Sequence, residues 1–460
     1  MMPVVQPFPA YKPCEAEKKI DDLVRLLNTS IFKTEYMDAV SGGALVATGL
    51  KSFAASLTSP RWTTSPILAS VAAPAARMNL VSAALFDLVC NAEYIHGRVT
   101  NRSWIYCNRH RLPVGDEAHA PYAYFSFLKQ CPMCCQDRGL DKRLTGAQHK
   151  PSSHHIGEIT TTAIAYFLAL MGAANERPLS VGTISKQSHD VDAMAWRDDV
   201  LVLFEIKASP LVTYPLRTAL DHPFLEEGDD GPVELAQHKL IDVDFQARDL
   251  SLFLANTGVD IPLGKPTGAS WPYVPLTEYI ARPDGLLDYL EAWSEIFQGY
   301  SVPKVLRKGR EIALGYLANG WGDEIDSNKT KAGLGRTDDI KKGTYQLLKF
   351  GAYYRDGSPI LPIRGALVAN LDPVFMFDAY MSKLVDARWA PAAKFRPSEV
   401  EGVTEINEAD LYYIYDTVIA FNRPIYNDPL SRALFNFQDM EAALLSGGLD
   451  DILRRWGTVI

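Results

Sequence analysis

Residues 200–206 (VLVLFEI) form a short apolar run that ends beside two ionisable side chains, Glu205 and Lys207. Such a run, rich in β-branched residues and bounded by Asp198, Asp199 and the pair Ser-Pro at 209–210, is typical of a strand buried on both faces. Side chains alternate along a strand, so Glu205 and Lys207 share one face, about 7 Å apart. The strand is therefore predicted to end with a carboxylate and an ammonium together.

Asp192 lies thirteen positions before Glu205 (205 minus 192), at the start of the short segment 193–196. We expect this segment to be an antiparallel strand that turns at 197–199 and brings Asp192 beside Glu205. Two converging carboxylates suit Mg²⁺, a hard cation that takes oxygen ligands and keeps several waters. The Ile206 carbonyl is a candidate third ligand. The alternative is a buried strand that ends in a surface ion pair.

The pattern of Asp192, Glu205 and Lys207 resembles the active site of the PD-(D/E)xK nuclease superfamily. The resemblance implies that Asp192 and Glu205 hold Mg²⁺. It also implies that Lys207 positions the attacking water and offsets charge that builds on a phosphate. These three residues are the predicted catalytic centre.

Two further acidic residues are candidates by the same resemblance. Members of the superfamily commonly carry a glutamate after a glycine on an earlier helix, and here Glu158 follows Gly157. Apolar residues at helical spacing over 159–170 predict that helix, with Glu158 in its first turn, where the helix dipole also favours a carboxylate. Asp190, one strand period before Asp192, is an accessory candidate.

A later helix and strand resemble the remainder of the same core. Residues 338–354 have helical periodicity, and the strand-like segment 363–369 follows them. Gln346 resembles the glutamine-then-aromatic motif on this helix in some superfamily members, and an exposed helical glutamine is the alternative. The predicted fold class is α/β, with a PD-(D/E)xK restriction-endonuclease-like core, that is, a central mixed sheet flanked by helices.

Cysteines and histidines upstream of this core have the spacing of a zinc site. Cys107 and His110 form one pair and Cys131 and Cys134 a second, with twenty residues between them, which suits a structural Zn²⁺. Cys135 could replace Cys134, and His119 or His149 could replace His110. Iron or an iron-sulfur cluster is another possibility. A further alternative is that these cysteines are ordinary buried or free thiols that bind no metal.

The net charge of −9 does not by itself exclude a nucleic-acid partner, because phosphate contacts depend on local charge. Basic residues cluster around 304–310, 328–342 and 142–143, although each cluster could equally be a solvated surface. The predicted DNA-binding side chains are Lys329, Lys331, Arg336, Lys341 and Lys342.

At 460 residues and 47% hydrophobic, the chain is long enough for several units. The apolar segment 66–90 contains Pro74, Arg77 and Asp87, which favours buried helices over a membrane span. Without a secretory leader or a disulfide framework, we expect a cytoplasmic, prokaryotic protein. The predicted units are a helical N-terminal region (1–100), a zinc-bound loop module (101–150), the nuclease core (151–210 and 338–375), a large insertion with a possible role in DNA recognition (211–337) and a C-terminal region (376–460).

No nucleotide-binding loop, serine-hydrolase elbow or metalloprotease helix is found in the sequence. The resemblance is therefore greatest to a type II restriction endonuclease, which implies a homodimer that cuts double-stranded DNA at a short sequence with Mg²⁺ and a cognate methyltransferase in the same restriction-modification system. The alternatives are a structure-directed or end-processing nuclease of repair or recombination, and a catalytically inert, zinc-dependent DNA-binding protein.

Overall fold

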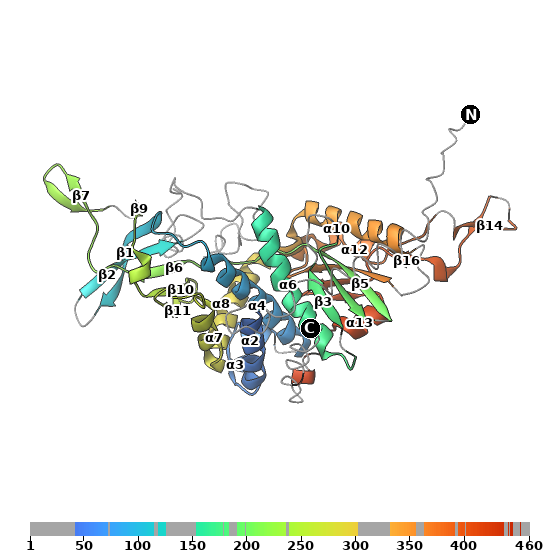
Figure 1. The fold of residues 1–460 in the computed structure, drawn as a ribbon, viewed down its shortest axis with the longest axis horizontal. Coiled ribbons are helices and arrows are strands. Elements are labelled where there is room, and N and C mark those ends of the chain that lie inside the picture. The colour runs from blue at the N-terminus through green and yellow to red at the C-terminus, as the bar shows by residue number, and fades with distance from the viewer. Residues whose placement is uncertain are drawn as a thin grey trace.

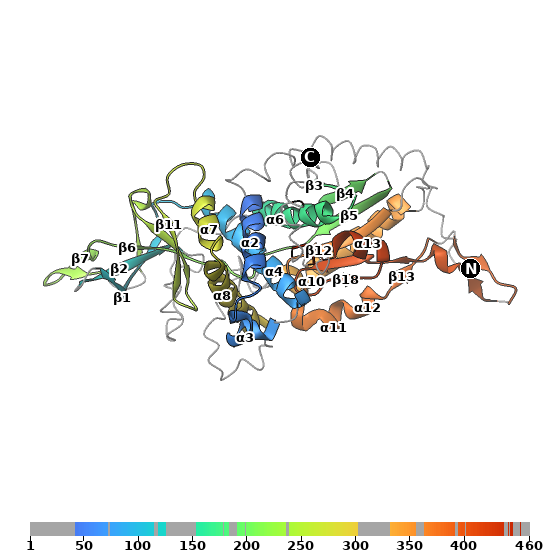
Figure 2. The ribbon, with the colours of Figure 1, turned by 90° about the horizontal axis from the view of Figure 1, so that it is seen from below.

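The computed structural model describes residues 42–71, 74–114, 118–125, 153–177, 179–183, 191–197, 199–235, 239–301, 332–355, 363–391, 394–400, 402–436, 440, 442–444 and 451. These residues form two six-stranded sheets, and helices lie between them (Figures 1 and 2).

The first sheet is mixed and has the order β18-β17-β12-β5-β4-β3. Its strands are β3 (Ser180–Thr183), β4 (Ala193–Arg197), β5 (Val200–Ile206), β12 (Ile363–Ala369), β17 (Thr417–Ala420) and β18 (Ile425–Tyr426). The strands β5, β12 and β17 are parallel, and β3, β4 and β18 are antiparallel to their neighbours. The hairpin predicted at 197–199 is confirmed, because Arg197 pairs with Val200.

Helices cover both faces of this sheet, which explains why every residue of β5 is buried. On one face, Val202 and Phe204 belong to the buried cluster that includes α6 (Ser153–Ala174). On the other, Leu201 and Leu203 belong to the cluster that includes α10 (Thr337–Phe350). The protein is therefore α/β, with a mixed sheet between helices. By the same alternation, Glu205 and Lys207 lie on the α10 side.

The second sheet is entirely antiparallel and has the order β11-β10-β6-β2-β1-β9. Its strands are β1 (Trp104–Val114), β2 (Ala118–Phe125), β6 (Leu216–Ala219), β9 (Leu240–Ile241), β10 (Leu250–Leu254) and β11 (Val259–Gly264). The segments 101–150 and 211–337, expected as separate units, thus share one sheet. Strands β1 and β2 also pair with each other where a loop module was expected, because their alternating aromatic residues pack into a core.

The helices between the sheets are α2 (Gly42–Ser56), α4 (Pro74–His96), α7 (Tyr273–Ile280) and α8 (Pro283–Ser301). The first two lie before residue 100, within the region that was expected to be helical. Buried helices were also expected over 66–90, and α4 is buried along most of its length. Residues 154–174 of α6 are long and apolar enough to cross a bilayer, and 72% of their most apolar stretch is buried against the rest of the protein.

Shorter elements complete the described chain. They are α3 (Arg61–Thr64), α11 (Phe377–Tyr380), α12 (Ser382–Val385), α13 (Pro429–Phe435), the 3₁₀ helices η3 (Leu68–Val71), η4 (Phe245–Ala247), η6 (Gly333–Gly335), η8 (Val374–Met376) and η10 (Glu408–Asp410), a π-helical turn η7 (Gly351–Arg355), and the strand pairs β7 (Leu225–Gly228) with β8 (Gly231–Glu234), β13 (Arg388–Trp389) with β16 (Tyr412–Tyr413), and β14 (Arg396–Pro397) with β15 (Thr404–Glu405).

A buried carboxyl group, Asp87 of α4, joins the helical layer to the chain that follows β5. Its Oδ2 accepts hydrogen bonds from the backbone N–H groups of Leu211 (2.9 Å) and Val212 (3.0 Å) and from Trp293 Nε1 of α8 (2.8 Å). Asn91, one turn later, accepts from the N–H of Tyr214 (2.8 Å). Burial raises the pKa of Asp87 to about 8, although the three donors favour the charged form.

We predict that Asp87→Ala destabilises the protein by about 3 kcal/mol or more, because three buried N–H groups lose their acceptor. Asp87→Asn keeps an oxygen at the same place and should cost about 1 kcal/mol or less. Urea denaturation of both variants at pH 7 measures the two free energies of unfolding. Equal stability of the two variants would contradict this role of Oδ2.

The raised pKa of Asp87 also predicts a dependence of stability on pH. Between about pH 4 and pH 8, the folded protein keeps a proton on Asp87 that the unfolded chain has lost, because the ordinary pKa is 3.8. The Asp87 contribution to the free energy of unfolding therefore falls as the pH rises through this window and is constant above it. Asp87→Asn lacks this titration, so its stability relative to the unmodified protein should rise from pH 4 to pH 8. A flat difference across the window would rule out the buried neutral carboxyl.

Candidate active site

The β4–β5 hairpin holds Asp192 against the end of β5. The backbone N–H of Asp192 donates to the carbonyl of Phe204 (3.2 Å), and Asp192 Oδ2 accepts from the N–H of Ile206 (2.9 Å). Asp192 is thus held in place through both its backbone and its side chain.

Lys207 lies where these groups meet. Its backbone N–H donates to Val368 of β12 (2.9 Å), and its Nζ donates to the carboxylate of Glu205, which is only 2% exposed. The same Nζ lies 3.9 Å from Asp192 Oδ2 and donates to the Ile206 carbonyl at 3.4 Å. The structure therefore brings the three predicted central residues together. Oxygen atoms of Glu205, Asp192 and the Ile206 carbonyl surround Lys207 Nζ.

The charges of this group support one another. Burial lowers the pKa of Lys207, but the carboxylates of Glu205 and Asp192 raise it by more, so the pKa of Lys207 lies above its usual value. The side chain is therefore an ammonium at neutral pH. It offsets the cost of holding the almost fully buried Glu205 carboxylate in the interior.

Asp339, in the first turn of α10, is a further acidic residue near this group that the sequence reasoning missed. Burial raises its pKa, whereas the positive charges of Arg336, Lys207 and Lys342 lower it, and the net pKa is above its usual value. Its position follows from the β5 alternation, which places Lys207 on the α10 side. In the sequence, the signal for Asp339 was an acidic residue at the start of the helix expected from residue 338.

Gly333 fixes where α10 begins. Its N–H donates to the carbonyl of Ser209 (3.1 Å), and the N–H of Leu334 donates to the carbonyl of Leu371 (2.9 Å). Gly333 has a φ of +50°, and a Cβ there would lie 2.4 Å from the Leu371 oxygen. Only glycine meets both conditions, so the start of α10 is held against the ends of β5 and β12.

Asn370 is a second residue that the sequence reasoning missed. It is fully buried after β12, its Nδ2 donates to the Ser209 carbonyl (2.7 Å), and its Oδ1 accepts from the Ser209 N–H (3.1 Å). These two bonds fix the chain two residues beyond Lys207. A polar residue directly after the apolar strand 363–369 was the signal for it.

Glu158 does not lie in the first turn of its helix, so that prediction was wrong. The helix α6 begins at Ser153, because residues 153–156 continue the helix and Gly157 is tolerated inside it. The Glu158 carboxylate is 53% exposed, and its oxygens lie 3.2 Å from His154 Nε2 and 3.5 Å from His155 Nδ1. Among the described residues, these two histidines rather than Lys207 are the nitrogen-bearing side chains against the Glu158 carboxylate.

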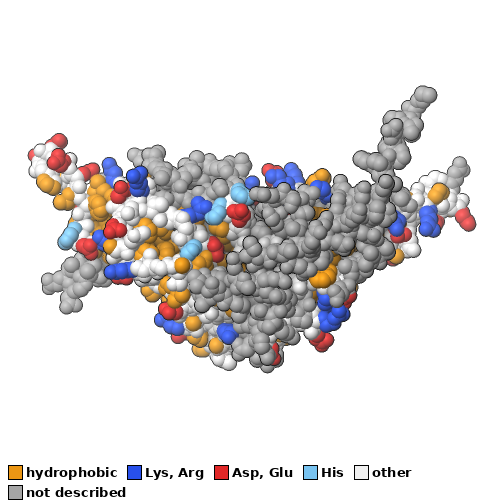
Figure 3. Space-filling model, in the orientation of Figure 1, with side chains coloured by type: hydrophobic (Ala, Val, Ile, Leu, Met, Phe, Trp, Pro, Cys, Tyr) orange, Lys and Arg blue, Asp and Glu red, His pale blue; other side chains and the backbone are white. Residues whose placement is uncertain are grey.

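Gln346 lies on α10 and is partly buried, and its Oε1 has no hydrogen-bond partner among the described residues. Lys341 and Lys342 are exposed on the same helix, and Arg336 forms an ion pair with Asp339 (3.5 Å). Figure 3 shows Lys and Arg side chains gathered along the upper edge of the molecule, over α10. Three further predicted residues, Asp190, Lys329 and Lys331, lie outside the described residues.

The predicted zinc ligands are described only in part. Cys107 is buried in β1. Cys131, Cys134, Cys135 and His149, and the side chains of His110 and His119, lie outside the described residues. Within the described part of the chain, no group of three or more His, Cys, Asp or Glu side chains is placed to hold a metal ion. The zinc site therefore stays a prediction.

A hard cation such as Mg²⁺ fits the residues at the end of β5. Asp192, Glu205 and the Ile206 carbonyl supply only oxygen atoms, and they already surround the positive charge of Lys207 Nζ. Mg²⁺ needs few protein ligands, since water completes its octahedron. Two carboxylates and a carbonyl therefore suffice.

Comparisons of the chain with models of protein families, with curated proteins and with solved structures find no match. A function for this protein is therefore inferred from the residues at the end of β5 and from their surroundings.

Proposed function

We propose that this protein is a Mg²⁺-dependent DNA endonuclease with a PD-(D/E)xK core, of the type II restriction class. The observation that carries the proposal is the convergence of the Asp192 and Glu205 carboxylates on Lys207 Nζ at the end of a buried strand. A surface ion pair would not need a glutamate that is almost completely buried.

The order of the elements supports the same proposal. The chain passes from the helix α6 through β3, β4 and β5 to α10 and then to β12, parallel to β5. This is the helix, hairpin, helix and strand arrangement that the sequence resemblance implies. The residues between β5 and α10 supply four strands of the second sheet, which in this proposal is the part that reads base edges in DNA.

In the proposed mechanism, Asp192 and Glu205 would hold Mg²⁺, and the ion would supply positive charge for the scissile phosphate and make a water molecule more acidic. The ammonium of Lys207 donates a hydrogen bond to the attacking water and offsets charge on the phosphate oxygens. The Ile206 N–H keeps Asp192 in place, and Asn370 holds the following chain. The products are a 5′-phosphate and a 3′-hydroxyl.

The surface of α10 suits a phosphate backbone. Lys341 and Lys342 are exposed there, and Lys342 is close enough for its charge to act on Asp339, which also interacts with Lys207. A DNA strand that follows this helix would therefore reach the end of β5. As a restriction enzyme the protein would act as a cytoplasmic homodimer on double-stranded DNA, with a structural Zn²⁺ and a separate methyltransferase to protect the host.

A structure-directed nuclease is the second candidate. The observation that favours it is Gln346, whose Oε1 is shielded from solvent without a hydrogen-bond partner among the described residues. A glutamine at this place on α10 could bind a nucleic-acid group. Discrete bands from closed circular DNA would exclude this candidate, whereas cutting only at free ends would favour it.

We predict that Asp192→Asn and Lys207→Ala each abolish cleavage of phage DNA in Mg²⁺ and largely preserve DNA binding. The first loses a metal ligand, and the second loses the donor to water and phosphate. Cleavage is read on gels with sequencing of the ends, and binding by fluorescence anisotropy in Ca²⁺.

The matched control is Asp199→Asn, at the opposite end of the same hairpin, where Asp199 pairs with Arg197 on the surface. It should cleave like the unmodified protein. Normal turnover by Lys207→Ala, or loss of cleavage in all three variants alike, would refute the assignment. DNA binding without cleavage by the unmodified protein in Mg²⁺ or Mn²⁺ would leave the inert binding protein as the explanation.

A further inference from the structure

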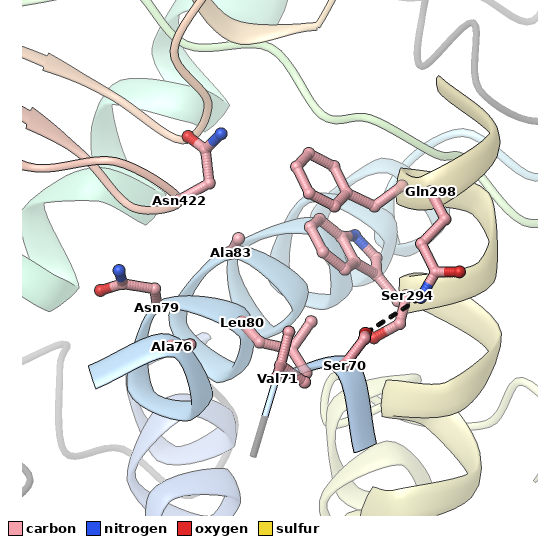
Figure 4. A pocket seen from close by; sticks show the side chains of 11 residues that line it. Ser70, Val71, Ala76, Asn79, Leu80, Ala83, Ser294, Gln298 and Asn422 are labelled. Atoms are coloured by element: carbon pink, nitrogen blue, oxygen red, sulfur yellow. Dashed lines mark hydrogen bonds between the residues drawn. The ribbon is translucent and has the colours of Figure 1, made fainter. Parts of the chain in front are cut away.

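A cavity of about 210 Å³ lies between η3, α4, α8 and the turn after β17 (Figure 4). Its walls are mainly apolar and include Leu80, Ala83, Trp293 and Phe297. None of the described residues that line it carries a charged side chain, which favours a ligand that is uncharged where it enters. The volume exceeds the roughly 150 Å³ that accommodates benzene.

The aromatic wall of the cavity is fixed in place. The Trp293 and Phe297 rings stack with centroids 5.3 Å apart and an angle of 13° between their planes. Trp293 Nε1 donates to the buried Asp87, so this ring cannot rotate away without the loss of that hydrogen bond. A rigid aromatic surface of this kind favours a flat ligand.

Polar groups of the cavity are neutral hydroxyls and amides. Ser294 is only 3% exposed, yet its Oγ has no hydrogen-bond partner among the described residues. Such a hydroxyl costs free energy unless something else bonds to it. Gln298 Nε2 donates to Ser70 Oγ (3.3 Å), and Figure 4 shows Asn79 and Asn422 on the opposite side of the cavity from Ser294 and Gln298.

We propose that this cavity binds a nucleobase. A nucleobase is flat and uncharged, its faces stack on aromatic rings, and its edge carries donors and acceptors that amides and a hydroxyl can satisfy. Ser294 Oγ is the group that gains its missing partner. The same chemistry is offered by a free nucleoside and by a base turned out of DNA.

The position of the cavity relates it to the end of β5. Asn422 follows β17, and its side chain exchanges two hydrogen bonds of 2.8 Å with Asp372, which follows β12. Because β5, β12 and β17 are parallel, all three ends lie at one edge of the sheet. Two strand spacings separate β17 from β5, about 10 Å. DNA as the source of the base rests on the proposed function, whereas the binding of a free nucleoside does not.

The test is calorimetric titration of the full chain with adenosine, guanosine, cytidine and thymidine. At least one should bind saturably, and Ser294→Ala should weaken it about tenfold through the loss of one buried hydrogen bond. Ala83→Leu, which fills the cavity, should abolish binding. The control is Ser82→Ala on α4. Ser82 also has a buried hydroxyl without a hydrogen-bond partner among the described residues, but it does not line the cavity, so the affinity of this variant for nucleosides should be unchanged.

A structural role for Ser294 predicts a lower melting temperature in Ser294→Ala. We expect an equal or higher melting temperature, because an unsatisfied polar group is removed. No saturable binding of any nucleoside at millimolar concentration, or equal binding by the unmodified protein and Ala83→Leu, would overturn the proposal.

A second arm separates the two sources of the base, with a fluorescent duplex oligonucleotide and Ca²⁺. If Ala83→Leu loses nucleoside binding and also binds the duplex more weakly, the base belongs to DNA. If only nucleoside binding is lost, the ligand is a free nucleoside, and the cavity assignment still stands. Failure of the unmodified protein to cleave DNA would count against the proposed nuclease and leave the nucleoside titration valid.

Discussion

The buried carboxyl group of Asp87 connects the helix α4 to α8 and to the chain that follows β5. One oxygen accepts from two backbone N–H groups just beyond the end of β5 and from the indole of Trp293 on α8. The same residue therefore fixes the chain that leaves the candidate active site and one wall of the neighbouring cavity. Its raised pKa shows that burial outweighs these three bonds, so the connection is made by a neutral group at moderate pH.

Strand direction explains why so many polar side chains collect at one edge of the first sheet. The parallel strands β5, β12 and β17 end together. Lys207 and Asn370 directly follow β5 and β12, and Asn422 lies two residues after β17. Inside the sheet, the same strands are almost wholly apolar, because helices cover both faces. Polar side chains are therefore concentrated at the ends of these strands, where water can reach the chain.

The spacing of residues along the sequence predicted those features that depend on short-range structure. The hairpin, the buried strand and the meeting of Asp192, Glu205 and Lys207 follow from strand periodicity within residues 192–207. The second sheet could not be predicted, since β2 pairs with β6 across some ninety residues, and nothing in either segment encodes that partner. Asp339 and Asn370 were missed for the same reason, because tertiary contacts bring them to Lys207 and Ser209. The predicted start of α6 was wrong because the helix begins at Ser153, ahead of the apolar spacing that starts at residue 159.

The threading of the chain through its two sheets has a consequence for how the protein can be divided. Strands β1 and β2 of the antiparallel sheet precede β3, β4 and β5 of the mixed sheet, and β6, β9, β10 and β11 follow them before the chain returns with β12. No single break in the gene would release either sheet intact. An exchange of one whole sheet between related genes would accordingly require three crossovers, before β3, before β6 and before β12.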